Sequence, residues 1–286
     1  MTTRRIGISV TTGMILLISF ALKAQTANGS VEALIQGRHL AQQILEQWPT
    51  ENFTNTGVLI IDDGHGRRSK VPIRFHVTFT PTNWSSIYEA YFTNRTESLA
   101  VVHSEGDPFR ELVDGPDVHP VSPEGIPNNN TGPIFPDLVV YHIIPYDTYD
   151  HAGVLASNSE AVRVQFASFA GSDFSVDDLR LEFFHWLKQK ILKPYEMRRG
   201  RSCKVLESVN PNPVPNGYSR VVSWIDNETL GIVQAEAYDA KGKLLKEFYP
   251  KDFKKVNGRW EVGEMEMIND QTGSRSWIKF DLNKNP

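Results

Sequence analysis

Acidic residues and histidines gather at two places in the chain where metal binding or acid–base chemistry could occur. Residues 147–151 place two carboxylates and an imidazole within one short run, and both kinds of group can bind a metal ion. Pro145 lies just before this run, so a polar loop is the favoured interpretation. The second group lies in a proline-rich stretch and receives the same interpretation: Asp114, Asp117 and His119. Neither group predicts a metal site or a catalytic residue.

The other reactive or charged side chains also favour structural roles. Cys203 lies in a predicted strand without an identifiable histidine partner, which predicts a buried thiol rather than a nucleophile. The glycine-rich run 64–68 could hold phosphate, but no helix follows it, so we interpret it as a hairpin turn. The basic run 198–201 could meet an anionic headgroup, although a solvated hairpin tip is favoured. The motifs of nucleotide-binding loops, zinc proteases, serine hydrolases and dithiol redox enzymes are missing from the sequence, so we predict no enzyme and no cofactor.

Composition restricts the class of protein further. Of the 286 residues, 40% are hydrophobic and 10% are aromatic, so the chain can bury a core and is not disordered. Its single cysteine cannot form an internal disulfide or supply a zinc finger. A formal net charge of -4 gives no electrostatic basis for binding nucleic acid, and we predict no such partner.

The N-terminus has the features of a secretory signal peptide. Arg4 and Arg5 precede the apolar run 6–22, and small residues follow this run. We predict a signal peptide over 1–24 and a single mature domain over 25–286. The alternative is an uncleaved N-terminal anchor. We favour cleavage, because the apolar run is only marginally long enough for a membrane-spanning helix. An exported chain with one thiol suits the bacterial periplasm better than a disulfide-built extracellular module.

Two helices are predicted in the mature chain. Apolar residues spaced three and four apart predict an N-terminal helix over 31–48, with Ser30 as its N-cap. Ser175 and Asp178 have the spacing of a capping box, which predicts the start of a second short helix over 176–187.

Most of the remaining chain has the alternating pattern of strands. Prolines crowd the stretch 106–136, which we interpret as a surface loop inserted into the domain. Turn residues recur at short intervals elsewhere, which indicates an antiparallel sandwich or barrel. Strands are predicted over 56–62, 71–80, 84–92, 138–144, 161–169, 188–197, 202–209, 218–225, 231–239, 243–254, 259–268 and 274–282.

Aromatic side chains recur on these strands and on the second helix. For any one of them, a place in a filled core is the favoured interpretation. The alternative is a curved sheet under a helical lid, with an apolar concave face that holds acyl chains.

Several stretches resemble LolA-like outer-membrane lipoprotein-sorting proteins of bacteria, a superfamily that also includes LolB-like and RseB-like envelope domains. The resemblance covers about residues 50–104 and 165–282, and the insert at 106–136 is not matched. The stretches that carry it are 53–57, 71–75, 83–89, 169–174, 178–186, 198–207, 217–226, 235–246, 253–260 and 272–275.

This resemblance implies a mainly β (α+β) fold, an open antiparallel half-barrel of about 10–11 strands. The N-terminal helix and the second short helix would form a lid over it. The resemblance also implies that the protein binds lipid or lipoprotein acyl chains in the periplasm. The family supplies no motif of functional side chains, so the predicted lining comes from the apolar pattern: Phe75, Phe79, Tyr88, Phe183, Phe184 and Trp186.

We therefore predict a non-enzymatic periplasmic carrier or binding protein for lipids or lipoproteins. Its expected partners are acyl chains and membrane-bound envelope proteins, without a metal or cofactor. Two alternatives remain open. One is an RseB-like envelope sensor that binds a partner protein, and the other is an enzyme with an undetected site near 147–151.

Overall fold

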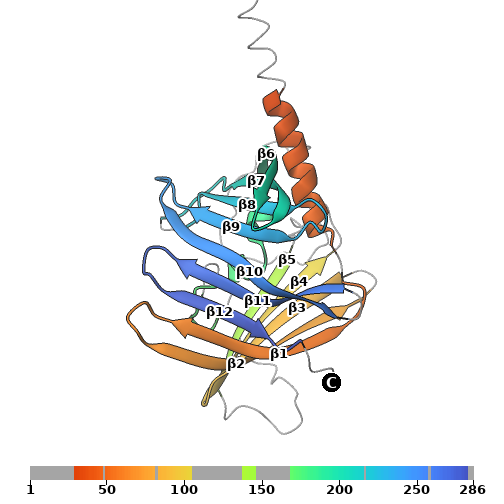
Figure 1. The fold of residues 1–286 in the computed structure, drawn as a ribbon. Helices are drawn as coiled ribbons and strands as arrows, with labels where there is room; N and C mark the ends of the chain where they lie inside the picture. Colours follow the sequence, from red (N-terminus) through yellow and green to blue (C-terminus); the bar gives the residue numbers. More distant parts are fainter. Residues whose placement is uncertain are drawn as a thin grey trace, which may run out of the picture.

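A computed structural model describes residues 29–47, 49–80, 83–104, 137–145, 168–215, 217–256 and 259–282. Its main element is one antiparallel sheet of twelve strands (Figure 1). The strands are β1 (Phe53–Asp62), β2 (Arg68–Phe79), β3 (Asn83–Tyr91), β4 (Arg95–Ser104), β5 (Asp137–Pro145), β6 (Lys188–Arg198), β7 (Arg201–Val209), β8 (Arg220–Asp226), β9 (Ile232–Tyr238), β10 (Leu244–Val256), β11 (Arg259–Asn269) and β12 (Arg275–Phe280).

The strand order divides the sheet into two meanders. It runs β5-β4-β3-β2-β1-β12-β11-β10-β9-β8-β7-β6, so each strand pairs with its neighbour in sequence except where β1 meets β12. At that junction Leu59 lies opposite Ile278, and both side chains are fully buried. The sheet is strongly curved and stays open, because β5 and β6 form its two edges and do not pair with each other (Figure 1).

The alternation seen in the sequence explains which face of each strand is buried. In β2, Val71, Ile73 and Val77 are buried, whereas Arg74 between them is exposed. Successive side chains of a strand point to opposite faces of the sheet, so this pattern gives β2 one apolar face and one polar face. The turn before β2 contains Gly64 at φ 75, a left-handed conformation that glycine adopts without strain. The run 64–68 is therefore a hairpin connection, as predicted.

The edge strand β6 is irregular. Its pairing with β7 shifts register between Ile191 and Lys193 and again between Lys193 and Glu196. Pro194, which has no N–H to donate, lies within the second shift. Leu192 and Tyr195 are exposed on this strand.

The N-terminal helix (residues 29–45) packs against the β6 end of the sheet. Its second half buries Leu40, Ala41 and Ile44, while its first half projects beyond the sheet and leaves Ile35 exposed (Figure 1). The helix was expected at this place. Its first described residue is 29, so Ser30 lies within its first turn instead of capping it.

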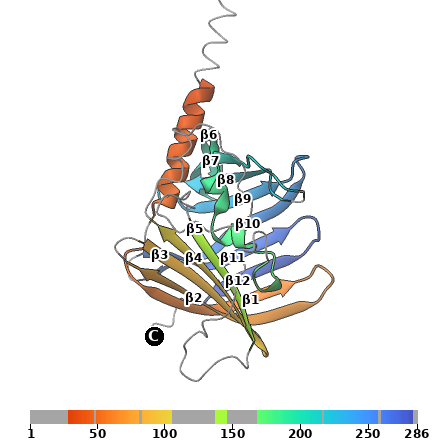
Figure 2. The same ribbon diagram turned by 180° about the vertical axis from the view of Figure 1, so that it is seen from behind.

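A second segment, residues 168–187, lies across the hollow of the curved sheet (Figure 2). It contains η3 (Phe169–Gly171), α2 (Val176–Leu179) and η4 (Glu182–His185). The predicted capping box is present, because the Ser175 hydroxyl accepts from the Asp178 backbone and the Asp178 carboxylate accepts from the Ser175 backbone. The predicted continuous helix over 176–187 is wrong. Leu181 adopts a left-handed conformation at φ 56, which ends α2 and redirects the chain into η4.

Two clusters of buried apolar residues lie between this segment and the sheet. The first joins β1–β4 to β11 and β12 through Phe169, Phe174 and Val176. The second joins the N-terminal helix to β6–β9 through Phe183 and Phe184. The segment 168–187 therefore contributes side chains to the cores of both meanders.

The predicted mainly β fold, with an open antiparallel sheet, an N-terminal helix and a short second helix, is confirmed. The sheet has twelve strands instead of about ten or eleven, and β4 was not predicted. The strand expected over 161–169 is not seen at its described end, where Phe169 begins η3. The signal peptide and the insert at 106–136 lie outside the described residues.

Candidate functional site

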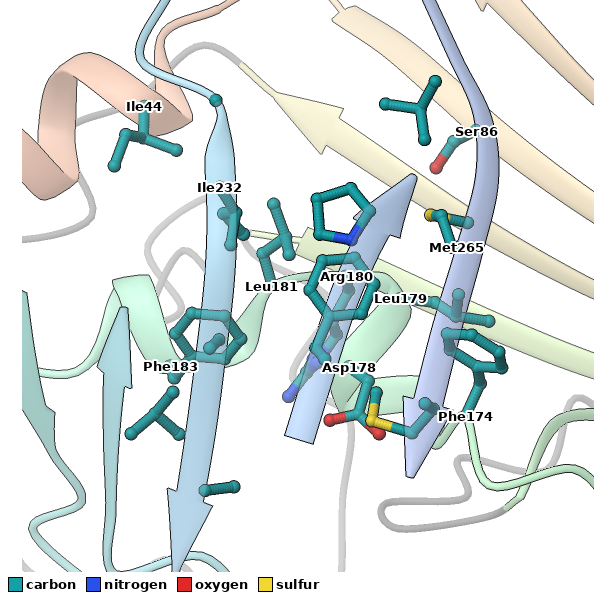
Figure 3. A pocket seen from close by; sticks show the side chains of 18 of the residues that line it. Ile44, Ser86, Phe174, Asp178, Leu179, Arg180, Leu181, Phe183, Ile232 and Met265 are labelled. Atoms are coloured by element: carbon teal, nitrogen blue, oxygen red, sulfur yellow. The ribbon is translucent and has the colours of Figure 1, made fainter. Parts of the chain in front are cut away.

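A cavity of about 370 Å³ lies between the sheet and the segment 168–187 (Figure 3). Most of its lining is apolar, and it draws on strands of both meanders and on the end of the N-terminal helix. The apolar and aromatic lining residues are Ile44, Leu45, Phe75, Trp84, Tyr88, Phe174, Leu179, Leu181, Phe183, Tyr218, Val221, Leu230, Ile232, Ala235, Ala237, Phe248, Pro250, Val262, Met265 and Met267. This volume falls within the range of small-molecule sites, which is roughly 300–1,000 Å³.

Aromatic rings from neighbouring strands form one wall of the cavity. Phe75 and Tyr88 are opposite each other in the β2–β3 ladder, with ring centroids 4.6 Å apart. Phe280 from β12 lies 5.8 Å from Phe75, and Phe169 lies 6.0 Å from Tyr88. Rings on adjacent strands pack closely because cross-strand side chains project from the same face. This wall is therefore held by packing on several sides.

Three of the six residues predicted as lining are in the cavity wall: Phe75, Tyr88 and Phe183. The other three are not. Phe79 is the last residue of β2, and Phe184 is fully buried in the second apolar cluster. Trp186 packs partly buried against that cluster. These three were chosen from the apolar pattern, and that pattern does not tell a cavity wall from a filled core.

A polar group interrupts the apolar lining. The Tyr218 hydroxyl donates to Asp178 Oδ1 at 2.8 Å, and the Lys246 ammonium lies 3.1 Å from Asp178 Oδ2. We call these three residues, Asp178, Tyr218 and Lys246, the Lys246 cluster. Asp178 also accepts from the backbone N–H and the hydroxyl of Ser175, at 2.8 and 2.7 Å. Sequence reasoning missed this cluster because its members come from α2, the loop before β8 and β10, and no local motif joins them.

Burial shapes the electrostatics of the two lining tyrosines. Burial raises the pKa of Tyr218 well above its ordinary value, and the neighbouring Asp178 carboxylate adds to the effect. Burial alone raises the pKa of Tyr88. Both hydroxyls therefore stay protonated and uncharged at neutral pH.

Buried polar contacts fix both ends of the segment 168–187. At one end, Asp173 accepts from the hydroxyls of Ser274 and Ser276, at 2.6 and 2.8 Å. Lys246 also donates to the backbone carbonyl of Asp173 at 2.7 Å. At the other end, the fully buried Gln189 donates to the carbonyls of Phe183 and Trp186 at 2.9 and 2.7 Å. The segment is thus a fixed cover over the cavity.

The sequence offered a cysteine and two acidic runs as candidates for catalysis or metal binding, and the structure describes only the cysteine. Cys203 is fully buried, and burial raises the pKa of its thiol, so the prediction of a structural thiol is confirmed. The runs at 147–151 and 114–119 lie outside the described residues. Within the described part of the chain, His, Cys, Asp and Glu side chains nowhere gather in a group suited to a metal ion. None of the described helices has the length and apolar character needed to cross a membrane.

Two solved structures share this architecture over most of their length. A DUF1329 family protein from Desulfovibrio piger ATCC 29098 is 18% identical, with a TM-score of 0.56, covering 88% of this chain and 95% of that one. A putative outer membrane lipoprotein-sorting protein domain from Vibrio parahaemolyticus is also 18% identical, with a TM-score of 0.57, covering 87% and 91%. A family model described as "Uncharacterized protein" matches residues 161–284, and no curated protein matches the chain.

These similarities define the class of the molecule by its fold. The open antiparallel sheet with helices on its concave side is shared with the DUF1329 family protein and with the putative outer membrane lipoprotein-sorting protein domain. It is also the fold that the resemblance in the sequence implied.

Proposed function

We propose that this protein is a non-enzymatic carrier or binding protein of the bacterial periplasm that holds acyl chains of lipids or lipoproteins. The observation that carries the proposal is the apolar cavity beneath the segment 168–187. A LolA-like sheet with a filled core would give no such space, whereas this sheet leaves about 370 Å³ between well-packed walls. The N-terminal signal-peptide pattern supports export from the cytoplasm.

The free energy for binding would come from removing an acyl chain from water. Each methylene group that enters an apolar site gains about 0.8 kcal/mol. Met265 and Met267 line the cavity, and their unbranched, polarizable side chains adapt to ligands of slightly different shape. The closely packed rings of Phe75 and Tyr88 would supply a more rigid part of the lining. The lining therefore combines one rigid and one adaptable surface.

The test measures bound lipid and then blocks the cavity. The full chain is expressed for export, purified from the periplasm and examined by native mass spectrometry, and N-phenyl-1-naphthylamine serves as an uncharged fluorescent probe of the apolar cavity. Ala235→Trp places an indole ring in the cavity, and we expect probe affinity to fall by about tenfold or more, the effect of losing roughly 1.4 kcal/mol of binding free energy. Ala240→Trp is the control, because Ala240 is exposed in the turn before β10.

Each outcome bears on the proposal. Co-purified lipid, with probe binding that Ala235→Trp weakens and Ala240→Trp preserves, supports it. A wild-type protein without lipid that also fails to bind the probe contradicts a carrier role. Equal probe binding by both variants, with circular dichroism showing both folded, contradicts the cavity as the site.

A further inference from the structure

The Lys246 cluster gives the cavity a polar end. In Figure 3, Asp178 lies at the end of the lining opposite Ile44 and Ser86. The side chains of Lys246 and Asp178 are only 17% and 9% exposed, so both charges are largely removed from water. A ligand that filled the cavity would meet apolar side chains along most of its length and this cluster at one end.

The hydrogen bonds of the cluster leave specific positions open. Asp178 Oδ2 accepts from Ser175 N, Ser175 Oγ and Lys246 Nζ, whereas Oδ1 accepts only from the Tyr218 hydroxyl and keeps a lone pair. Lys246 uses two of its three N–H groups, on Asp178 and on the Asp173 carbonyl, and its ammonium lies 5.5 Å from the centroid of the Tyr218 ring. The Tyr218 hydroxyl donates to Asp178, and its oxygen can also accept. The remaining N–H of Lys246 and acceptor positions on Tyr218 and Asp178 Oδ1 can therefore meet the head of a ligand.

The charge around the cluster selects against an anion. Asp178 neutralises Lys246. The other cation in the lining, Arg180, lies 3.1 Å from Asp177 and 2.8 Å from Glu182. Acidic groups outnumber basic ones in this region, and in a poorly solvated site an additional negative charge would be repelled. Asp177 responds to this environment, since burial raises the pKa of its carboxyl.

The cavity volume suits a ligand with one acyl chain. A methylene group is close in size to a water molecule, whose share of liquid volume is about 30 Å³. A space of 370 Å³ therefore corresponds to roughly twelve such groups. This volume favours one acyl chain over two chains of that length side by side.

We propose that the cavity binds a single-chain amphiphile of roughly a dozen carbons whose uncharged polar head lies against Lys246 and Tyr218. An acyl ester with free hydroxyl groups, as in a monoacylglycerol, matches the available donor and acceptor. A fatty acid carboxylate, a phosphate ester and a diacyl lipid do not. This inference rests on the proposed carrier function and names the class of ligand for the same site.

The experiment compares three ligands that share one chain and differ in the head. Monododecanoylglycerol, dodecanoic acid at pH 8 and dodecylamine each compete with the uncharged probe N-phenyl-1-naphthylamine for the full chain. We expect monododecanoylglycerol to bind about tenfold more tightly than dodecanoic acid, which the acidic surroundings repel, and than dodecylamine, whose ammonium would lie beside that of Lys246; tenfold is the effect of about 1.4 kcal/mol. Equal affinities, or a preference for dodecanoic acid or dodecylamine, would overturn the inference while leaving the carrier function in place. Failure of every ligand and of the probe would instead contradict the carrier function.

Two variants test the role of the cluster itself. Asp178→Asn removes one negative charge but keeps an oxygen that accepts hydrogen bonds, so dodecanoic acid should gain at least severalfold relative to monododecanoylglycerol. Tyr218→Phe removes only the hydroxyl and should reduce the advantage of monododecanoylglycerol by severalfold. The affinity ratio is the readout, because a general loosening of the fold would weaken all three ligands together. An unchanged ratio in folded Tyr218→Phe, or in folded Asp178→Asn, contradicts the assignment of the head to this cluster.

Discussion

Alkaline pH should destabilise this protein through the ionisation of its buried tyrosine hydroxyls. Tyr88 lies in the wall of the cavity, and burial raises its pKa, so the folded protein keeps a proton that the unfolded chain releases above about pH 10. The stabilising effect is complete below that pH. It is lost as the pH rises beyond it, because the unfolded state then binds fewer protons than the folded state.

Tyr88→Phe removes this group and should reduce the alkaline loss of stability. Between pH 9 and pH 11 we expect the free energy of unfolding to fall by about 1 kcal/mol less in the variant than in the wild type. Urea denaturation at the two pH values measures the difference. Tyr195→Phe is the matched control, because the Tyr195 side chain is 62% exposed. Equal losses in wild type and Tyr88→Phe would show that Tyr88 does not resist ionisation.

At the level of single residues, the sequence predicted the candidate site only in part. Phe75 could be found because apolar residues alternate along β2, and Tyr88 lies opposite it on β3. The Lys246 cluster could not, because residues 178, 218 and 246 meet only through the curvature of the sheet. Charged side chains in strands are usually solvated, so Lys246 gave no sign of its buried position.

Strands and helices matched their predictions where the local sequence pattern determines them. They differed where contacts with distant parts of the chain determine them. The β10–β12 meander was predictable from alternation and turn residues. β4 was missed because Thr96 and Glu97, two adjacent polar residues, are both buried. Glu97 is held by Arg95 at 2.8 Å and by the backbone N–H of Ala170 at 3.0 Å, contacts that only the folded chain provides. The left-handed Leu181 likewise has no local signal, since leucine seldom adopts that conformation.

The N-terminal helix depends on a close approach to β6 that only glycine permits. A Cβ atom on Gly37 would lie 2.6 Å from backbone atoms of Gln189 and Lys190, which cannot move independently of the strand. We expect Gly37→Ala to lower the free energy of unfolding by about 1–3 kcal/mol, despite the higher helix propensity of alanine. Thermal unfolding and limited proteolysis of the helix measure the effect.

Gly29→Ala is the control for this variant. It lies in the same helix, and no atom lies within 4 Å of an added Cβ, so stability should stay constant or rise slightly. A Gly37→Ala protein as stable as Gly29→Ala would contradict the tight contact between helix and strand.

The two meanders of the sheet are joined where β1 pairs with β12, two strands that are far apart in sequence. Ile278 of β12 lies opposite Leu59 of β1, and both belong to the cluster that unites the meanders. We expect Ile278→Ala to reduce the free energy of unfolding by about 2–5 kcal/mol, measured by urea denaturation. Ile35→Ala deletes the same atoms at a side chain that is 59% exposed and should change stability by about 0.5 kcal/mol or less. Similar effects of the two substitutions would contradict a cooperative junction.

The irregular edge strand β6 affects whether copies of this protein can pair edge to edge and aggregate at high concentration. A flat, regular edge offers a row of unpaired backbone groups onto which another chain can add a strand, and growth of that kind leads to aggregates. On β6, two register shifts and Pro194 interrupt the row, and exposed Lys188 and Lys193 add charges that oppose the approach of a second copy. The β6 edge can therefore stay unpaired without adding strands from neighbouring molecules.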